Sequence, residues 1–286
     1  MSLLKKLKLI FTRFAGNTLP IESGKKKYGN NGEDFFNKNL KELLPECQIK
    51  RNVFIKTEKT TGEIDCLILY QNKLFAVEIK RWKGEITEKD DVFIQKKKDK
   101  YTGEIYTKAL KSPYKQLNRA IYLLKEEIKG DVFINPIVYF AGDDYKKITI
   151  NENHIYFYNI EGLVNYIKNY GKETFKKKEA INFFLKCNES DYIYASNFFN
   201  KSIHCIIYNA SLNFETTQSL LTRKDISEIH IIHHMTYDEL EIYLKDNSVR
   251  KIKIENGSIK VKSINDQVST YSFSKINYIK LGKNNI

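Results

Sequence analysis

The stretch of sequence between residues 63 and 84 constrains the fold of this chain more than any other. Two short apolar runs, Ile64–Tyr70 and Leu74–Ile79, are separated by only three residues. Runs of this length and composition are typical of β-strands, and so short a connection predicts a hairpin of adjacent antiparallel strands. Because Asp65 opens the first run and Glu78 lies near the end of the second, we expect the two carboxylates to be neighbours.

The second run also places a carboxylate beside an ammonium group. Side chains alternate across a strand, so Glu78 and Lys80 project from one face. Two carboxylates at one site repel each other unless a divalent cation lies between them, and hard oxygen ligands suit Mg²⁺ or Mn²⁺. A lysine beside such a metal can orient a water molecule or help to deprotonate it, as metal-assisted phosphodiester hydrolysis requires.

The plainer interpretation is a solvent-exposed Asp65 and a surface ion pair between Glu78 and Lys80, which would contribute little to stability. Aspartate is depleted in strands, however, and Asp65 interrupts a run that is otherwise suited to burial. We therefore expect a neighbouring group to neutralise the Asp65 carboxylate.

Four blocks of sequence carry a resemblance to a known family. They are Gly29-Asn30-Asn31-Gly32-Glu33, Gly62-Glu63-Ile64-Asp65, Val77-Glu78-Ile79-Lys80-Arg81-Trp82-Lys83-Gly84 and Ser112-Pro113-Tyr114-Lys115-Gln116-Leu117. In this order they resemble the nuclease-related domain (NERD) of the PD-(D/E)XK nuclease superfamily. The resemblance covers residues 25–150, about half of the chain.

The resemblance implies roles for the candidate catalytic residues, which are Asp65, Glu78, Lys80, Glu33 and Gln116. Asp65 and Glu78 would bind Mg²⁺ or Mn²⁺, with Glu33 as a helix-borne third ligand. Lys80 would activate the attacking water, and Gln116 would hold the lysine or a substrate phosphate.

Several of these residues also have ordinary structural interpretations. Glu33 is the kind of residue that the helix macrodipole favours near a helix N-terminus. The family's Gln-X-X-X-Tyr pattern fails here, since Ala120 stands four residues after Gln116, so the role of Gln116 stays open. Glu63 fits a supporting role as well as metal ligation, and Trp82 fits a role in shaping the strand exit as well as stacking on a base.

The charge of the chain favours a polyanionic partner. The formal net charge is +13, and residues 1–150 hold 30 Lys and Arg against 20 Asp and Glu, whereas residues 151–286 hold 18 against 15. Positive charge beside an acidic metal site would attract a phosphate backbone, so DNA is the expected partner and RNA stays open as a second substrate. A biased composition rich in Lys, Asn and Ile is the alternative explanation.

The order of predicted elements indicates an α/β fold with a restriction-endonuclease-like core, a mixed sheet flanked by helices, followed by a smaller β-rich domain. The expected divisions are residues 1–24, 25–171 and 172–286. In the core we expect helices over 32–44, 113–129 and 161–170, strands over 52–57, 132–140 and 155–159, and a small hairpin within 85–111. A further helix over 179–187 would follow a basic connector.

The C-terminal part alternates apolar and polar residues in a way that predicts a β-meander. Asn256-Gly257 is typical of a type I′ turn and would join strands around Ile254 and Ile259. The sequence there contains no catalytic motif, so we expect a binding module or a contact between copies of the chain. His230, His233 and His234 are interpreted as ordinary strand residues, because alternation puts only the first and third on one face.

The N-terminal segment predicts a basic amphipathic helix. Its apolar residues recur at helical spacing between cations: Leu3, Leu4, Leu7, Ile10, Phe11 and Phe14. Such a helix either packs on the domain body or, over residues 3–14, lies on an anionic membrane surface. The four cysteines are far apart and no run of 18 apolar residues exists, so we expect a reducing, cytoplasmic location, with attachment to the inner face of the membrane as the alternative.

Together these observations predict a divalent-metal-dependent nuclease that acts on DNA, in DNA processing or in defence against foreign DNA. The alternatives are a nucleic-acid-binding protein without catalysis and a membrane-docked protein that uses this fold for binding. The sequence leaves open whether cleavage would be internal or from an end.

Overall fold

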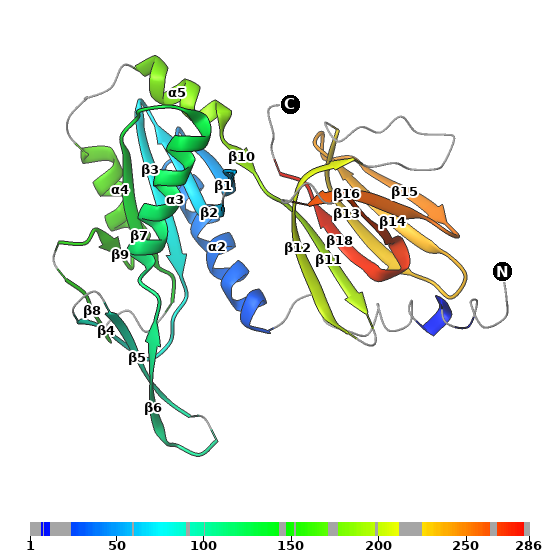
Figure 1. Cartoon of the computed structure of the whole chain (residues 1–286), viewed down its shortest axis with the longest axis horizontal. Coiled ribbons are helices and arrows are strands. Elements are labelled where there is room, and N and C mark those ends of the chain that lie inside the picture. Colours follow the sequence, from blue (N-terminus) through cyan, green and yellow to red (C-terminus); the bar gives the residue numbers. More distant parts are fainter. Residues whose placement is uncertain are drawn as a thin grey trace. The chain divides into compact units, whose positions relative to one another are not determined.

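The chain forms two compact units in a computed structural model, which Figure 1 shows. The structure describes residues 7, 9–11, 24–58, 60–89, 92–99, 101–142, 147–151, 153–170, 177–197, 200–211, 225–263 and 268–282. We call residues 25–189 the α/β unit and residues 190–283 the β unit. Each unit is described by itself.

A six-stranded sheet is the centre of the α/β unit. Its strands in spatial order are β10 (Asn188–Glu189), β1 (Gln48–Lys56), β2 (Thr61–Tyr70), β3 (Lys73–Lys80), β7 (Ile134–Phe140) and β9 (Tyr156–Phe157). Strands β1, β2 and β3 pair antiparallel, whereas β7 runs parallel to β3 and β9 parallel to β7. The hairpin predicted from the two apolar runs is therefore confirmed, and Gln71, with φ of 56°, makes its tight turn.

Helices cover both faces of this sheet and enclose two separate cores. On one face α3 (Pro113–Ile128) and α5 (Lys177–Lys186) pack on Leu67, Leu74 and their neighbours. On the other face α2 (Gly24–Leu43) and α4 (Ile160–Asn169) pack on Phe75, Val77 and their neighbours. The predicted fold class, a mixed α/β sheet flanked by helices, is confirmed.

Helix α3 begins where its sequence predicts. Ser112 is the N-cap, and its Oγ accepts a hydrogen bond from the Lys115 backbone N–H at 3.3 Å. Pro113 follows at the first helical position, where its missing N–H costs nothing. The helix ends at Lys129, whose left-handed conformation provides the C-cap.

Two expectations about this unit need correction. Helix α2 begins at Gly24 and not at residue 32, so residues 24–31, which precede the expected helix, form its first part. The stretch 85–111, expected to hold only a small hairpin, contains three strands. It forms most of a second sheet in the order β6 (Ile105–Leu110), β5 (Val92–Lys98), β4 (Glu85–Lys89) and β8 (Ile148–Thr149).

Residues beyond the expected boundary at 171 still belong to the α/β unit. Phe183 and Phe184 of α5 are both 3% exposed and lie in the core under α3. The Lys50 ammonium on β1 donates hydrogen bonds to the carbonyl oxygens of Leu185 and Cys187, at 3.1 and 2.5 Å. Strand β10 pairs with β1 directly after this segment.

The β unit is one eight-stranded sheet. Its order is β15 (Val249–Ile254), β14 (Asp238–Leu244), β13 (Ile226–His233), β18 (Ile276–Lys280), β11 (Asp191–Asn197), β12 (Asn200–Ser211), β16 (Ser258–Ser263) and β17 (Val268–Ser272). The β-rich character is as predicted, but the simple meander is wrong. Strand β18 lies between β11 and β13, and it is separated from β17 by a short 3-10 helix, Phe273–Lys275.

The hairpin predicted at Asn256-Gly257 is also wrong. Strand β15 pairs with β14, whereas β16 pairs with β12 and β17, so the segment between β15 and β16 crosses from one part of the sheet to another. The Gly257 carbonyl accepts a hydrogen bond from the Phe273 N–H at 3.0 Å. The turn signal in the sequence therefore marks a contact with the 3-10 helix.

The predicted N-terminal helix lies mostly outside the described residues. Residues 7 and 9–11 are helical, with Leu7 46% and Phe11 65% exposed. Packing on the body and attachment to an anionic surface both stay predictions. Among the described helices, none combines the length and apolar character that crossing a bilayer would require.

We predict that a fragment of residues 1–189 folds its α/β unit, whereas a fragment of residues 1–172 is less stable by roughly 3–6 kcal/mol. The shorter fragment loses Phe183 and Phe184, each of which contributes about 1.5–3 kcal/mol on burial, and it leaves the Lys50 ammonium without its two carbonyls. Urea unfolding followed by circular dichroism measures the difference. Equal midpoints for both fragments would show that α5 and β10 do not belong to this unit.

Candidate functional site

Glu78 is a fully buried charged group of the α/β unit. It lies on the central strand β3 and its side chain is 0% exposed, while that of Lys80 is 20% exposed. As the alternation predicts, the two side chains meet: the Lys80 ammonium donates a hydrogen bond to Glu78 Oε1. Within the described chain, Glu78 Oε2 is buried and has no hydrogen-bond partner. Glu78 is thus no surface ion pair, and half of its carboxylate is available for a ligand.

Asp65 stands at the place where strands β2 and β3 separate. Their pairing ends at Cys66 and Val77, although β3 continues to pair with β7 as far as Lys80. In place of the next backbone bond, the Ile79 N–H donates to Asp65 Oδ2 at 2.7 Å. Asp65 is therefore fixed beside Glu78, as the hairpin predicts, by replacing a backbone acceptor of the sheet.

Glu33 brings a third carboxylate from helix α2. Its pKa is raised to about 8, mainly by burial and in addition by the negative charges of Asp65 and Glu63. On strand β1, the Arg51 guanidinium forms an ion pair with Asp34 at 2.5 Å and partly offsets this rise. Glu33 therefore belongs to the same electrostatic group as Asp65, which agrees with its predicted position.

The same repulsion acts on the strand carboxylates. Burial and the neighbouring Asp65 raise the pKa of Glu78 well above its usual range, although Lys80 opposes the shift. Burial likewise raises the pKa of Asp65, against the effect of Lys80 and the Ile79 N–H. Burial lowers the pKa of Lys80, but Glu78 and Asp65 outweigh it and leave this pKa raised. Lys80 therefore stays protonated, while burial makes it costly for the neighbouring carboxyl groups to ionise.

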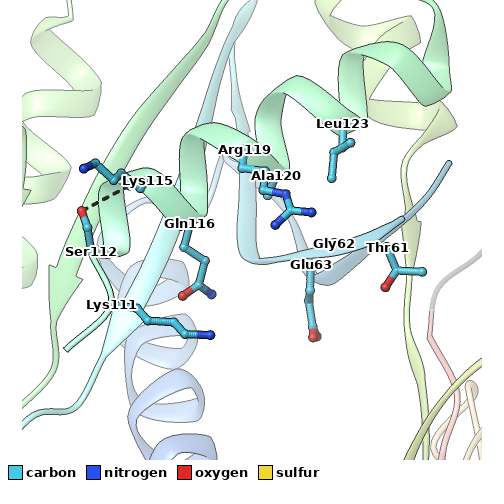
Figure 2. A pocket seen from close by; sticks show the side chains of 10 residues that line it. All are labelled: Thr61, Gly62, Glu63, Lys111, Ser112, Lys115, Gln116, Arg119, Ala120 and Leu123. Atoms are coloured by element: carbon cyan, nitrogen blue, oxygen red, sulfur yellow. Dashed lines mark hydrogen bonds between the residues drawn. The ribbon is translucent and has the colours of Figure 1, made fainter. Parts of the chain in front are cut away.

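Gln116 lines a cavity of about 640 Å³ at the start of α3, whose lining does not include Asp65, Glu78 or Glu33. The cavity is lined by Thr61, Gly62, Glu63, Lys111, Ser112, Lys115, Gln116, Arg119, Ala120 and Leu123. In Figure 2 the side chains of Lys111 and Gln116 extend from the α3 side and Glu63 from the β2 side. Glu63 both lines the cavity and raises the pKa values of Glu33 and Glu78, so it connects the two parts.

The sequence did not single out Arg51, Lys111 or Arg119 as site residues. Arg119 lines the cavity and donates a hydrogen bond to Thr60 Oγ1 at 3.2 Å. Lys111 and Arg119 are exposed and flank the Pro-X-X-Gln block, one before α3 and one on it, and this spacing was the signal that could have indicated them. Arg51 stands between Lys50 and Asn52 in β1, before the apolar run Val53–Ile55, and this polar stretch gives no sequence signal for a site.

Other residues named from the sequence have structural roles. The Trp82 ring packs against Phe93 and Phe140, with ring centroids 5.8 Å apart in both pairs. Gly84 has φ of 85°, and a Cβ there would come within 2.3 Å of the Lys96 carbonyl oxygen, so this position requires glycine.

The three histidines of the β unit have separate surroundings. Buried His233 is hydrogen-bonded to Asp238 at 2.8 Å, and His230 lies 3.2 Å from Glu228 Oε1. The His234 ring stacks on Tyr237. These contacts are those of ordinary side chains in and beside a strand.

The donor set of the carboxylate group suits a hard divalent cation. Its oxygens repel one another, and Glu78 Oε2 is an orphaned acceptor that a cation would satisfy. As the side chains stand, no three His, Cys, Asp or Glu residues of the described chain are arranged to enclose a metal. Because Lys80 occupies Glu78 Oε1 and Ile79 occupies Asp65 Oδ2, these carboxylates would have to adjust on binding.

Comparison with known families agrees with this geometry. Residues 28–141 match the family described as NERD, the nuclease-related domain. The whole match lies within the α/β unit, and the family is the one that the four sequence blocks resemble. No curated protein and no solved structure matches the chain.

We predict that the metal-free protein loses stability as the pH rises from about 5 to 8.5. The pKa of Glu33 is about 8 in the folded state against a usual 4.5, so the folded state binds more protons between these values and its stability falls as they leave. Glu33→Gln should therefore be more stable than the parent at pH 8.5, by on the order of 1–3 kcal/mol, and nearly equal to it at pH 5. Chemical unfolding in EDTA at both pH values measures this.

The matched control is Glu42→Gln, which replaces an exposed glutamate on the same helix. It should follow the parent at both pH values. A Glu33→Gln variant that also follows the parent would contradict the raised pKa of Glu33, which burial and the strand carboxylates produce together.

Proposed function

We propose that this protein is a divalent-metal-dependent nuclease that hydrolyses phosphodiester bonds of DNA. The observation that carries the proposal is the buried Glu78 carboxylate, which has one orphaned oxygen and lies beside Asp65 and Lys80 in a nuclease-related domain. A fold that needed only stability would gain from an apolar residue at this central position, because burying a charge is costly. A retained buried carboxylate therefore supports a functional role.

In this proposal Asp65 and Glu78 would hold Mg²⁺ or Mn²⁺, and Glu33 would join them directly or through water. When bound, the cation would neutralise the carboxylates and stabilise negative charge on the scissile phosphate. It would also remove the repulsion between the carboxylates, which adds to the effect of burial in raising the pKa values of Glu33 and Glu78.

Lys80 would act as a cation beside the reacting atoms. Its raised pKa keeps the amine protonated, so it suits orientation of the attacking water and stabilisation of charge on the phosphate. A role as the water's base would require the bound cation to lower that pKa first. Its bond to Glu78 holds the ammonium at the strand end, where it is partly open to solvent.

The cavity at α3 would receive the phosphate backbone next to the cleaved bond. Lys111, Lys115 and Arg119 supply positive charge there, and Gln116 supplies an amide. Gln116 would accordingly position the substrate and not bind the metal. Phosphate contacts of this kind do not distinguish DNA from RNA, so both belong in the test.

The second candidate function is nucleic-acid binding without catalysis. It is favoured by one observation: Lys80 and Ile79 occupy two of the four oxygens of Glu78 and Asp65. In that case DNA would bind at the cationic cavity, and added metal would have no effect on it.

We predict that the purified protein cleaves DNA with Mg²⁺ or Mn²⁺, and that Glu78→Gln or Asp65→Asn lowers the rate by on the order of 10²–10³ or more, as for loss of a group that stabilises the transition state. Supercoiled, linear and single-stranded DNA and an RNA of equal length, with and without EDTA, define the substrate and the mode of cleavage. Glu42→Gln is the control and should cleave as the parent does. Cleavage in EDTA, or full activity of both site variants, would overturn the assignment.

We further predict that Lys80→Gln lowers the maximal rate far more than it changes the metal concentration for half-maximal rate. An ammonium group does not ligate a cation, and its removal frees Glu78 Oε1, so metal binding should be equal or tighter. A metal titration of the initial cleavage rate separates the two effects. If weaker metal binding were the sole defect, the role of Lys80 would be structural.

A further inference from the structure

The hairpin of strands β5 and β6, within residues 92–110, extends away from the α/β unit (Figure 1), and we call it the ribbon. Its β5 strand also pairs with β4 from Val92 to Lys96, so the ribbon is two-stranded in its distal part. Its pairs run without a shift from Phe93 opposite Leu110 to Lys98 opposite Ile105. Hydrogen bonds also fix its turn. Asp99 Oδ1 accepts from the Tyr101 and Thr102 N–H groups, both at 2.8 Å, and the Asp99 N–H donates to the Glu104 carbonyl at 2.7 Å.

The base of the ribbon is firmly anchored. Phe93 is 0% exposed and packs against Tyr114 and Trp82. The Gln95 amide donates a hydrogen bond to the Lys83 carbonyl at 2.7 Å, and Gly84 allows the close approach of the Lys96 backbone. The ribbon is therefore a stiff extension of the domain.

The outer part of the ribbon is exposed on both faces. Strand side chains alternate, so a strand that only stabilises a fold buries every second residue, yet all of 105–109 are exposed. Three large side chains are among the exposed residues of the ribbon and its turn: Tyr101 at 93%, Ile105 at 63% and Tyr106 at 48%. Exposed apolar and aromatic groups on an edge strand favour association, which proteins keep only where it serves a purpose.

Lysines occupy both faces of the ribbon. Cross-strand partners share a face, so Lys96 and Lys98 lie with Thr107 and Ile105 on one face. Lys108, opposite Gln95, lies on the other face, where Tyr106 also lies. A ribbon with cations on both faces matches a groove with phosphates along both walls, and the major groove of B-form DNA admits a two-stranded β-ribbon.

Positive charge also leads from the ribbon to the candidate active site. Lys111 follows β6 directly, and Lys111, Lys115 and Arg119 line the cavity that Glu63 shares with the carboxylate group. A duplex held by the ribbon would thus have cationic contacts along α3 in the direction of Glu78.

We propose that the ribbon is a DNA-binding arm that lies in the major groove of a duplex. Lys96, Lys98 and Lys108 contact phosphates on its two walls, and Tyr101 and Tyr106 contact base edges or sugars. This inference rests on the proposed nuclease function and adds to it the duplex as the form of substrate and the surface that holds it.

The test measures binding by the full-length protein in EDTA, where a metal-dependent nuclease does not cleave. Fluorescence anisotropy gives the Kd of a labelled 20-base-pair duplex and a 20-nucleotide single strand between 50 and 200 mM salt. Lys96→Gln/Lys98→Gln/Lys108→Gln and Tyr101→Ala/Tyr106→Ala are compared with the parent. The control is Lys168→Gln/Lys178→Gln/Lys186→Gln, which removes equal charge from exposed lysines of α4 and α5, at the other end of the unit (Figure 1).

We expect the ribbon lysine variant to bind the duplex at least tenfold more weakly at 100 mM salt, and its slope of log Kd against log salt to fall by about 2–3, close to 0.9 for each lost phosphate contact. The tyrosine variant should lose affinity with an unchanged slope. The control should stay within about twofold of the parent at each salt concentration, as expected for lysines without phosphate contacts.

Two results would contradict the proposal that the ribbon is a DNA-binding arm. One is duplex binding by both ribbon variants equal to the control, which would leave the exposed ribbon for a protein partner. The other is an equal loss for duplex and single strand, which would exclude binding in a groove. Thermal unfolding confirms that each variant is folded. Since binding is measured without metal, these results stand whether or not the cleavage assay succeeds.

Discussion

The burial of the Glu78 carboxylate is the constraint on which the candidate site depends. A charged group at the centre of a sheet requires a partner, and this chain supplies Lys80 from the same strand and the same face. The pairing is incomplete, since no residue that the structure describes pairs with Glu78 Oε2, and Asp65 adds a second negative charge nearby. The packing of the sheet therefore holds the carboxylates together although they repel each other. This arrangement is expected where function and stability make opposite demands.

The sheet can hold such a group because its other contacts are extensive. Strand β3 pairs with β2 on one side and with β7 on the other, and separate cores under α3 and α2 fix its two faces. Strands β2 and β3 separate just where Asp65 replaces a backbone acceptor, so the fold creates the gap without losing the hydrogen bond of Ile79. Helix α3 then serves twice, because its apolar face covers the core while its first turns carry Gln116 and Arg119, with Lys111 just before its N-cap.

The second sheet has a different relation to the core. Ile86 and Phe93 on its inner side form a small core with Tyr114 and Phe140. The distal part of β6, residues 105–109, is exposed to solvent. A stiff ribbon with such a base can present cations and aromatic rings at a fixed place relative to the carboxylates. The β unit carries none of the residues discussed for catalysis, and its buried His233 and Asp238 are paired with each other.

The sequence by itself determined the features that depend on neighbours along the chain. Alternation placed Glu78 and Lys80 together, the short connection paired β2 with β3, and Ser112-Pro113 set the start of α3. Tertiary structure alone decided the rest. Contacts between residues distant in sequence set the hydrogen bond from Ile79 to Asp65 and bring Glu63 and Arg51 to the site. Such contacts also place α5 in the α/β unit and pair β15 and β16 with different strands. Local propensity fixes the conformation of a segment, but burial and cross-sheet pairing decide its partners, and for that reason the Asn256-Gly257 turn signal failed while the hairpin before Glu78 did not.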